Sequence, residues 1–259
     1  MTGTLLARVV GRVGRRAPSP DPSSGADGLP DHHHRDVRGG GLRAAVFGVS
    51  DGLVSNVSLV LGTVGAHPGA GVIRLAGLAG LFGGAFSMAV GEYVSMQAQR
   101  EAFERELSIE REELRRRPEF ERRELTRIYE RRGIEREVAA QLATELMADP
   151  EVALETHARE ELGIDPGELG APLQAAGSSF ITFALGALVP LLPFLLGAKG
   201  TAAVGITIGL SALAAVAIGS LLSVLTARPW WRSALRQLVL CALAGAATFG
   251  IGSAIGIAG

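Results

Sequence analysis

Acidic residues are missing from the last third of the sequence. All 26 Asp and Glu residues precede position 169, and 20 of them lie between positions 101 and 168. Beyond that point only Lys199, Arg228, Arg232 and Arg236 carry charge. A water-exposed domain of this length would need more charge on its surface, so this part of the chain is expected to lie in a membrane.

Cysteine and net charge are also nearly absent. The single cysteine, Cys241, has no partner for an internal disulfide, so no oxidising compartment is implied. A formal net charge of −1 lacks the one-sided basic field of a nucleic-acid-binding protein, so no nucleic-acid partner is expected.

Residues 1–40 contain no apolar stretch of signal-peptide length and are predicted to form a disordered cytoplasmic tail. Its His32–His34 triplet is more typical of a solvated cluster than of a metal site.

Long apolar runs, by contrast, are plentiful. A helix needs about 20 apolar residues to cross the hydrocarbon core of a bilayer. The segments that meet this length are 44–66, 72–97, 175–197, 201–226 and 235–257. Helices are expected because backbone groups in lipid must be hydrogen-bonded within their own segment. The sequence therefore predicts an all-α, polytopic membrane protein surrounded by lipid, with transmembrane helices 1–2 in residues 41–97 and 3–5 in residues 173–259.

Arginines mark one end of the predicted hairpins. They precede the first span, follow the second, and separate the fourth from the fifth; the set is Arg35, Arg38, Arg43, Arg100, Arg105, Arg228, Arg232 and Arg236. Because cytoplasmic loops carry an excess of Lys and Arg, this pattern places the N-terminus and residues 98–172 in the cytoplasm. We expect a multi-pass protein of the cytoplasmic membrane of the cell.

Residues 98–172 are predicted to be an acidic helical insert. The second span continues as a helix until Pro118, and helices follow over 119–132, 135–148 and 150–163. Gly133 is a C-terminal cap signal, and the Asp149-Pro150 pair has the form of an N-cap with proline in the first turn.

Only two carboxylates, Asp51 and Glu92, fall inside the predicted spans. A charge at the centre of a membrane helix costs about 3 kcal/mol on insertion scales, so each is a functional-site hypothesis. The alternative is that they reach the interface or satisfy a nearby arginine. For Glu92, a functional role and an interfacial position are equally favoured. Asp51 is deeper and has hydroxyl and amide neighbours, which favours a functional role.

The predicted hairpin brings Asp51 level with Met88. Each lies about 18 residues from the turn at 69–70, and both helices rise 1.5 Å per residue. Gly84, Met88 and Glu92 recur every four residues and share one face. Two carboxylates and a thioether are therefore expected to line one cleft. Such a mixture of hard and soft ligands suits Fe(II) and Mn(II) better than Ca(II).

The insert offers a second group of metal-ligand types. Its residues at helical spacing are Glu106, Glu110 and Glu113, then Glu121 and Glu124, then His157 with Glu160 and Glu161. They could form a carboxylate–imidazole site. From spacing alone, however, a solvated surface stabilised by Glu–Arg pairs four residues apart is favoured.

Three stretches of this chain resemble the vacuolar iron transporter family, also called CCC1-like. They are Ser50-Asp51-Gly52-Leu53-Val54-Ser55-Asn56, then Gly84-Ala85-Phe86-Ser87-Met88-Ala89-Val90-Gly91-Glu92-Tyr93-Val94-Ser95, and His157-Ala158-Arg159-Glu160-Glu161-Leu162-Gly163-Ile164. Pro190 and Pro193 in the third span are also similar. The likeness extends from Gly41 to the C-terminus.

The resemblance implies a five-span homodimer that exports Fe(II), and often Mn(II), from the cytosol in exchange for protons. It implies no cofactor, because the metal is the transported substrate. Asp51 and Met88 match residues that the family uses along the ion path. Glu113, Glu124 and Glu161 match its cytoplasmic glutamates, and His157 stands where plant members tend to have methionine.

The chain also departs from the family pattern. Gly80 replaces an acidic residue of some members, so proton coupling by that route is in question and Glu92 is a candidate substitute. Arg116 and Arg127 stand where other members have glutamate, which predicts a weaker or smaller metal cluster in the insert. The metal set inferred overall is Asp51, Met88, Glu92, Glu110, Glu113, Glu124, His157 and Glu161.

Two other classes of function compete with a transporter. In one, the insert is a metal sensor or scaffold and the spans only anchor it. In the other, the protein is an intramembrane enzyme, but the sequence contains no His-Glu-x-x-His and no Gly-x-Ser-x-Gly motif, and no paired-Asp motif of lipid-head-group transferases. A transporter, not an enzyme, is therefore expected.

Overall fold

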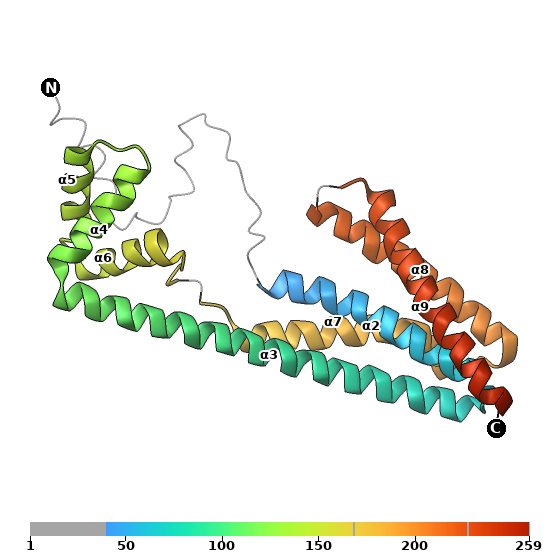
Figure 1. Ribbon diagram of the computed structural model, residues 1–259. Coiled ribbons are helices and arrows are strands. Elements are labelled where there is room, and N and C mark those ends of the chain that lie inside the picture. Colours follow the sequence, from blue (N-terminus) through green and yellow to red (C-terminus); the bar gives the residue numbers. More distant parts are fainter. Residues whose placement is uncertain (1–39, 168, 227, 259) are drawn as a thin grey trace, which may run out of the picture. The chain divides into compact units, whose positions relative to one another are not determined.

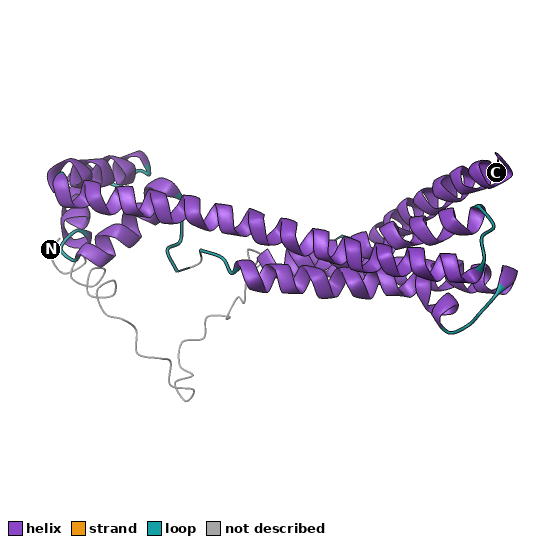
Figure 2. Ribbon diagram, turned by 90° about the horizontal axis from the view of Figure 1, so that it is seen from below, coloured by secondary structure: helices purple, strands orange, loops and turns teal. Residues whose placement is uncertain are grey.

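The computed structural model describes residues 40–258, except 168 and 227. The predicted tail up to residue 39, with its His32–His34 triplet, lies outside the described residues. Within them every regular element is a helix and none is a strand (Figure 2). This confirms the predicted all-α class.

The membrane-spanning helices agree with the five predicted spans. They are α2 (Gly40–Gly65), α3 (Ala70–Arg116), α7 (Pro172–Leu195), α8 (Gly200–Thr226) and α9 (Trp230–Ala258). Among the described residues, five helices are long and apolar enough to cross a membrane. The structure differs most at α9, which begins five residues before the predicted span because Pro229 sets its first turn.

The chain folds into two compact units. One contains residues 99–169, and the other contains the described residues of 37–98 and 170–259. The helix α3 contributes its first part to the second unit and its last part to the first.

In the membrane unit, α2 runs beside α7 and also packs against α9 (Figure 1). Glycines allow the close crossing with α7. A Cβ added at Gly52 would overlap the backbone carbonyl of Phe183, and one at Gly186 would overlap that of Val49. Small residues at facing positions let helix backbones approach, which is the main means of helix association in lipid.

Two prolines, Pro190 and Pro193, lie inside α7 and are both buried. Each removes one backbone N–H from the helix. Thr207 on α8 donates a hydrogen bond of 3.1 Å to the carbonyl of Pro190, which ties α8 to this part of α7.

The insert contains α4 (Pro118–Arg131), α5 (Arg136–Leu146), α6 (Pro150–His157) and the π-helix η1 (Ala158–Leu162). Its core holds Leu125 and Tyr129 of α4 against small residues of α5. The predicted caps are confirmed: Asp149 accepts from the N–H of Glu151 at 2.8 Å, and Gly133 has a φ of 90°. The predicted helix over 150–163 begins at Pro150 and is capped by Gly163 as expected, but its last turn widens into the π-helix η1.

Candidate metal centres

Four ligand-bearing side chains of the insert meet at one point: Glu110 of α3, Glu121 of α4, His157 of α6 and Glu161 of η1. One ligand atom of each lies within 4.8 Å of all the others. Nδ1 of His157 is 3.2 Å from a carboxylate oxygen of Glu110, 3.4 Å from Glu161 and 4.0 Å from Glu121. The separations are short enough for one cation to contact several of these groups.

Burial distinguishes this cluster from an ordinary acidic surface. Glu110 and Glu121 are each 4% exposed and His157 is fully buried, while Glu161 remains open to solvent. Acidic side chains are rarely buried without a partner. Among the described residues, Nε2 of His157 has no hydrogen-bond partner, so the cluster has ligand capacity to spare.

Local sequence turns these groups inward. On α4, Glu121 lies on the face of Leu125, Ile128 and Tyr129, all of which are buried. The π-helix η1 starts directly after His157 and ends at Gly163, whose φ of 67° is left-handed. Single π-turns are frequent at functional sites because they re-aim side chains within a helix.

Burial and closely spaced charges raise the pKa values of side chains in this cluster. Burial, reinforced by the charge of Glu110, raises the pKa of Glu121 to about 7. Burial and the charges of Glu110 and Glu124 also raise the pKa of Glu161. For His157, burial acts to lower the pKa, but the adjacent carboxylates of Glu110 and Glu161 outweigh it and the pKa is raised. Near neutral pH the cluster thus holds protons that a metal ion would displace.

The structure groups the predicted insert residues differently from the sequence. Glu110, His157 and Glu161 are brought together, whereas Glu113 and Glu124 are not members of the cluster. Glu113 is exposed and Glu124 is half-buried, and the charges of both contribute to raising the pKa of Glu121. Glu121 is one of the insert residues that could form a carboxylate–imidazole site, but it is not in the inferred metal set, although its place on the apolar face of α4 is visible in the sequence.

The interpretation of the insert as a solvated surface holds only in part. Glu112 pairs with Arg115 and Arg116, and Glu119 pairs with Arg122, at helical spacing on the exposed side. It is wrong for Glu110 and Glu121, which are buried. Arg116, one of the departures from the family pattern, pairs with Glu112.

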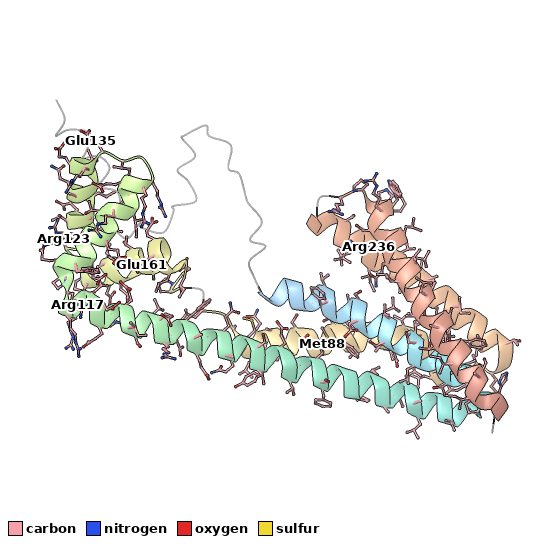
Figure 3. The ribbon with its side chains drawn as sticks, viewed as in Figure 1. Met88, Arg117, Arg123, Glu135, Glu161 and Arg236 are labelled. Carbon is pink, nitrogen blue, oxygen red and sulfur yellow. The ribbon has the colours of Figure 1, made fainter. Side chains whose placement is uncertain are left out.

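The membrane unit has a separate polar pocket between α2, α3 and α7, with a volume of about 420 Å³. Asp51 and Met88 both line it, as expected from their equal depth (Met88 is marked in Figure 3). Ser55 donates a hydrogen bond of 3.0 Å to Asp51 Oδ1 and lines the same pocket. A hydroxyl bonded to one carboxylate oxygen orients the group and leaves its other oxygen available.

Glu92 is not brought into this pocket. Gly80, Gly84 and Met88 line it, but Glu92 is half-buried and is not among the described residues that surround the cavity. Although Glu92 shares a helical face with Gly84 and Met88, it does not line the Asp51–Met88 pocket.

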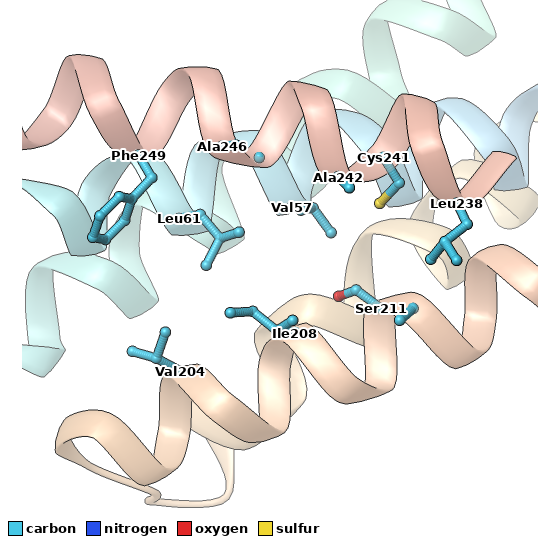
Figure 4. Close-up of a pocket in the computed structure, with 12 residues that line it drawn as sticks. Val57, Leu61, Val204, Ile208, Ser211, Leu238, Cys241, Ala242, Ala246 and Phe249 are labelled. Carbon is cyan, nitrogen blue, oxygen red and sulfur yellow. The ribbon is translucent and has the colours of Figure 1, made fainter. Parts of the chain in front are cut away.

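A second cavity, of about 390 Å³, lies between α2, α8 and α9 (Figure 4). Its walls are apolar apart from Ser211 and Cys241, and no described residue that lines it carries a charge. Such a lining offers little to a hydrated cation, so the Asp51–Met88 pocket is the better ion site of the two.

The comparisons with known proteins all identify the same family. The model of the VIT family matches residues 42–253. Vacuolar iron transporter 1 of Eucalyptus grandis is 32% identical over 214 residues, which cover 83% of this chain and 86% of that protein. A vacuolar iron transporter of Acanthamoeba castellanii is 40% identical over 161 residues, or 61% of this chain and 58% of that protein.

These matches correct the predicted location. The relatives are named for the vacuole, an internal compartment, so the prediction of the cell's cytoplasmic membrane is wrong. Arginine distribution distinguishes the two sides of a membrane but carries no signal for which membrane it is. The multi-pass arrangement stands.

The predicted class of function is confirmed at the level of the family. The relatives are named as transporters, which agrees with the expectation of a transporter instead of an enzyme. With a family match over most of its length and relatives above 30% identity, the chain belongs to the VIT family.

Proposed function

We propose that this protein moves Fe(II), and also Mn(II), across the membrane away from the cytosol. The observation that carries the proposal is the pocket in which Asp51 faces the same space as Met88. A carboxylate supplies charge for a divalent ion, and a thioether adds affinity for metals later in the series than Mg(II) or Ca(II). The family match to iron transporters supports the same substrate class.

We propose that the insert gathers metal before transport. Glu110, Glu121, His157 and Glu161 supply up to four ligands, and binding would release the protons that the cluster holds near pH 7. Glu113 and Glu124 are proposed to add negative charge that attracts cations without direct ligation. The arginine pattern supports a cytosolic location for this cluster.

A homodimer is proposed from the exposure of the polar pocket. Asp51 and Ser55 are exposed in the single chain although they lie within a membrane-spanning helix. A carboxylate facing lipid would cost about 3 kcal/mol, so this face of α2 requires a protein neighbour. A second copy packed on the same face would supply it, because isologous contacts use one surface twice.

Exchange for protons is the proposed driving force. Asp51 and Glu92 are the carboxylates within the apolar spans, and both change charge when they bind a proton. Gly80 removes the acidic group that some family members have nearby, so Asp51 is assigned the larger share of this exchange.

The assignment can be tested in a metal-sensitive host. We expect the wild-type chain to raise tolerance to Fe(II) and Mn(II), and Asp51→Ala to abolish this at equal expression. Glu119→Ala, which removes an exposed carboxylate of the insert that pairs with Arg122, serves as the matched acidic control and should retain protection. Equal protection by Asp51→Ala and wild type would contradict the proposed path. Metal binding without any protection by the wild type would favour a sensor.

A further inference from the structure

Asn56 is a buried polar residue in the middle of α2 that the sequence motifs did not single out as a ligand. It is 1% exposed and lines the same pocket as Asp51 and Met88. Its side-chain oxygen, Oδ1, has no hydrogen-bond partner among the described residues. A buried amide oxygen without a partner destabilises the fold, so its retention calls for a reason.

The orientation of this amide is fixed by its other end. Nδ2 of Asn56 donates a hydrogen bond of 2.5 Å to the backbone carbonyl of Ala187 on α7. A carbonyl can only accept, so the NH₂ group must face Ala187, and a flipped amide would place two acceptors together. Oδ1 is therefore held away from α7 as a free acceptor.

Gly80 shows where that oxygen points. A Cβ added to Gly80 would lie 3.0 Å from Asn56 Oδ1, so the oxygen faces α3 across the pocket. The same Cβ would overlap Cδ2 of Leu59, so the Leu59 side chain borders this space as well. Asn56 is five residues beyond Asp51 on α2, which corresponds to a rise of about 7 Å along the helix.

The geometry points to Asn56 Oδ1 as a metal-binding position on the ion path, one step beyond Asp51 and Met88. This inference rests on the proposed transport function and adds a residue to it. The amide oxygen is a hard, neutral ligand of the kind that Mn(II) and other hard divalent cations accept. An ion that leaves the Asp51 carboxylate would be stabilised next by this oxygen.

A neutral second position has a consequence for transport. A conducting path needs sites that bind well enough to be entered and weakly enough to be left. Asp51 provides charge, whereas Asn56 holds an ion only by its dipole and takes up no proton in return. The step at Asn56 would therefore favour release toward the far side of the membrane.

Two substitutions at Asn56 distinguish its proposed role as a metal ligand from its structural role. Asn56→Leu and Asn56→Met both lose the bond to Ala187, but only methionine returns a ligand atom, a soft thioether. We expect Mn(II) flux into proteoliposomes to fall at least about tenfold in both variants, a loss typical of disturbed metal sites. We expect Cd(II) flux to be several-fold higher in the methionine variant than in the leucine variant, because soft ligands favour soft cations.

A second pair leaves Asn56 and its bond to Ala187 in place. Gly80→Ala puts a methyl group 3.0 Å from Oδ1 and displaces the end of the Leu59 side chain, whereas Gly83→Ala on the same helix meets no other atom within 4 Å. We expect Gly80→Ala to reduce Mn(II) flux at least about fivefold, and Gly83→Ala to leave it unchanged. Alanine is favoured over glycine in helices, and the atom nearest to a Cβ at Gly80 is the flexible end of Leu59, so neither change should unfold α3.

The outcomes separate the inference from the proposed function. If wild-type protein carries no divalent metal, the transport proposal itself fails. If wild type carries metal and the leucine and methionine variants show the same Cd(II) flux, Asn56 is a structural clamp and the inference is overturned. Wild-type flux in Gly80→Ala would overturn it equally, and this result does not depend on the Asn56 variants folding.

Discussion

At the scale of single residues, the environment of a glutamate, more than its residue type, determines whether it belongs to the candidate metal site. The insert contains many glutamates, yet burial sets Glu110 and Glu121 apart from their exposed neighbours. The same burial, reinforced by crowding with like charges, raises the pKa of Glu121 to about 7, where a proton is exchanged under ordinary conditions. His157 holds the cluster together because it faces three carboxylates through one nitrogen.

The raised pKa predicts a pH-dependent metal affinity. Below pH 7, Glu121 carries a proton that an incoming ion must displace, whereas above pH 7 it is already ionised. Affinity of the insert for Mn(II) should therefore rise with pH, by up to about tenfold per pH unit for each proton displaced. Glu121→Gln should bind more weakly at pH 8 and show a shallower slope, measured by calorimetric titration of the full chain between pH 6 and 8.

The control for this prediction is Glu119→Gln on the same helix. Glu119 is exposed and pairs with Arg122, so its loss should leave both affinity and slope near wild type. If Glu121→Gln had the same pH slope as wild type, Glu121 would not be the group whose proton is displaced.

At the scale of elements, close helix contacts depend on glycine. The crossing of α2 and α7 places Gly52 and Gly186 against backbone atoms of the facing helix. This crossing also carries the Asn56–Ala187 hydrogen bond, so it positions one wall of the polar pocket. Overpacking here should affect stability and transport together.

We expect Gly186→Ala to destabilise the membrane unit by about 1–3 kcal/mol, because its Cβ would overlap the carbonyl of Val49. The measurement is the midpoint of thermal unfolding in detergent. Gly205→Ala on α8 is the matched control, since a Cβ there meets no atom within 4 Å. An unchanged midpoint in Gly186→Ala would mean that the helices separate easily at this crossing.

The elements themselves could be predicted from the sequence because their signals are local. Apolar length gave the spans, Pro118 and Gly133 gave helix ends, and Asp149 gave a cap. The candidate sites were only partly predictable. Whether Glu110 or Glu113 turns inward depends on α4 and α6 packing against α3, and the bond from Asn56 to Ala187 joins residues 131 positions apart. The widened turn of η1 leaves no pattern in composition.

At the scale of the whole molecule, the unpaired charge on α2 requires a partner. Asp51 is exposed in one chain, and lipid is a poor neighbour for a carboxylate. The polar pocket is therefore expected to be completed by a second copy.

Cysteine cross-linking tests this arrangement. Ser55 is exposed on the Asp51 face of α2, and the native Cys241 is buried and can be replaced by serine. Ser55→Cys in a Cys241→Ser background should form a disulfide-linked species of twice the 26.9 kDa chain mass on mild oxidation in membranes. Leu243→Cys, which is exposed on α9, should remain monomeric. Equal cross-linking at both positions would indicate random collision instead of a defined interface.

The central claim is that a divalent ion crosses the membrane past Asp51. Its most direct measurement is Mn(II) and Fe(II) uptake into proteoliposomes, with and without an opposing pH gradient, for wild type and Asp51→Asn. The account predicts uptake by wild type that increases with the gradient, and uptake near the protein-free level for Asp51→Asn, because the amide keeps the shape but neither carries charge nor exchanges a proton. Uptake by Asp51→Asn equal to wild type, with the same response to the gradient, would contradict it.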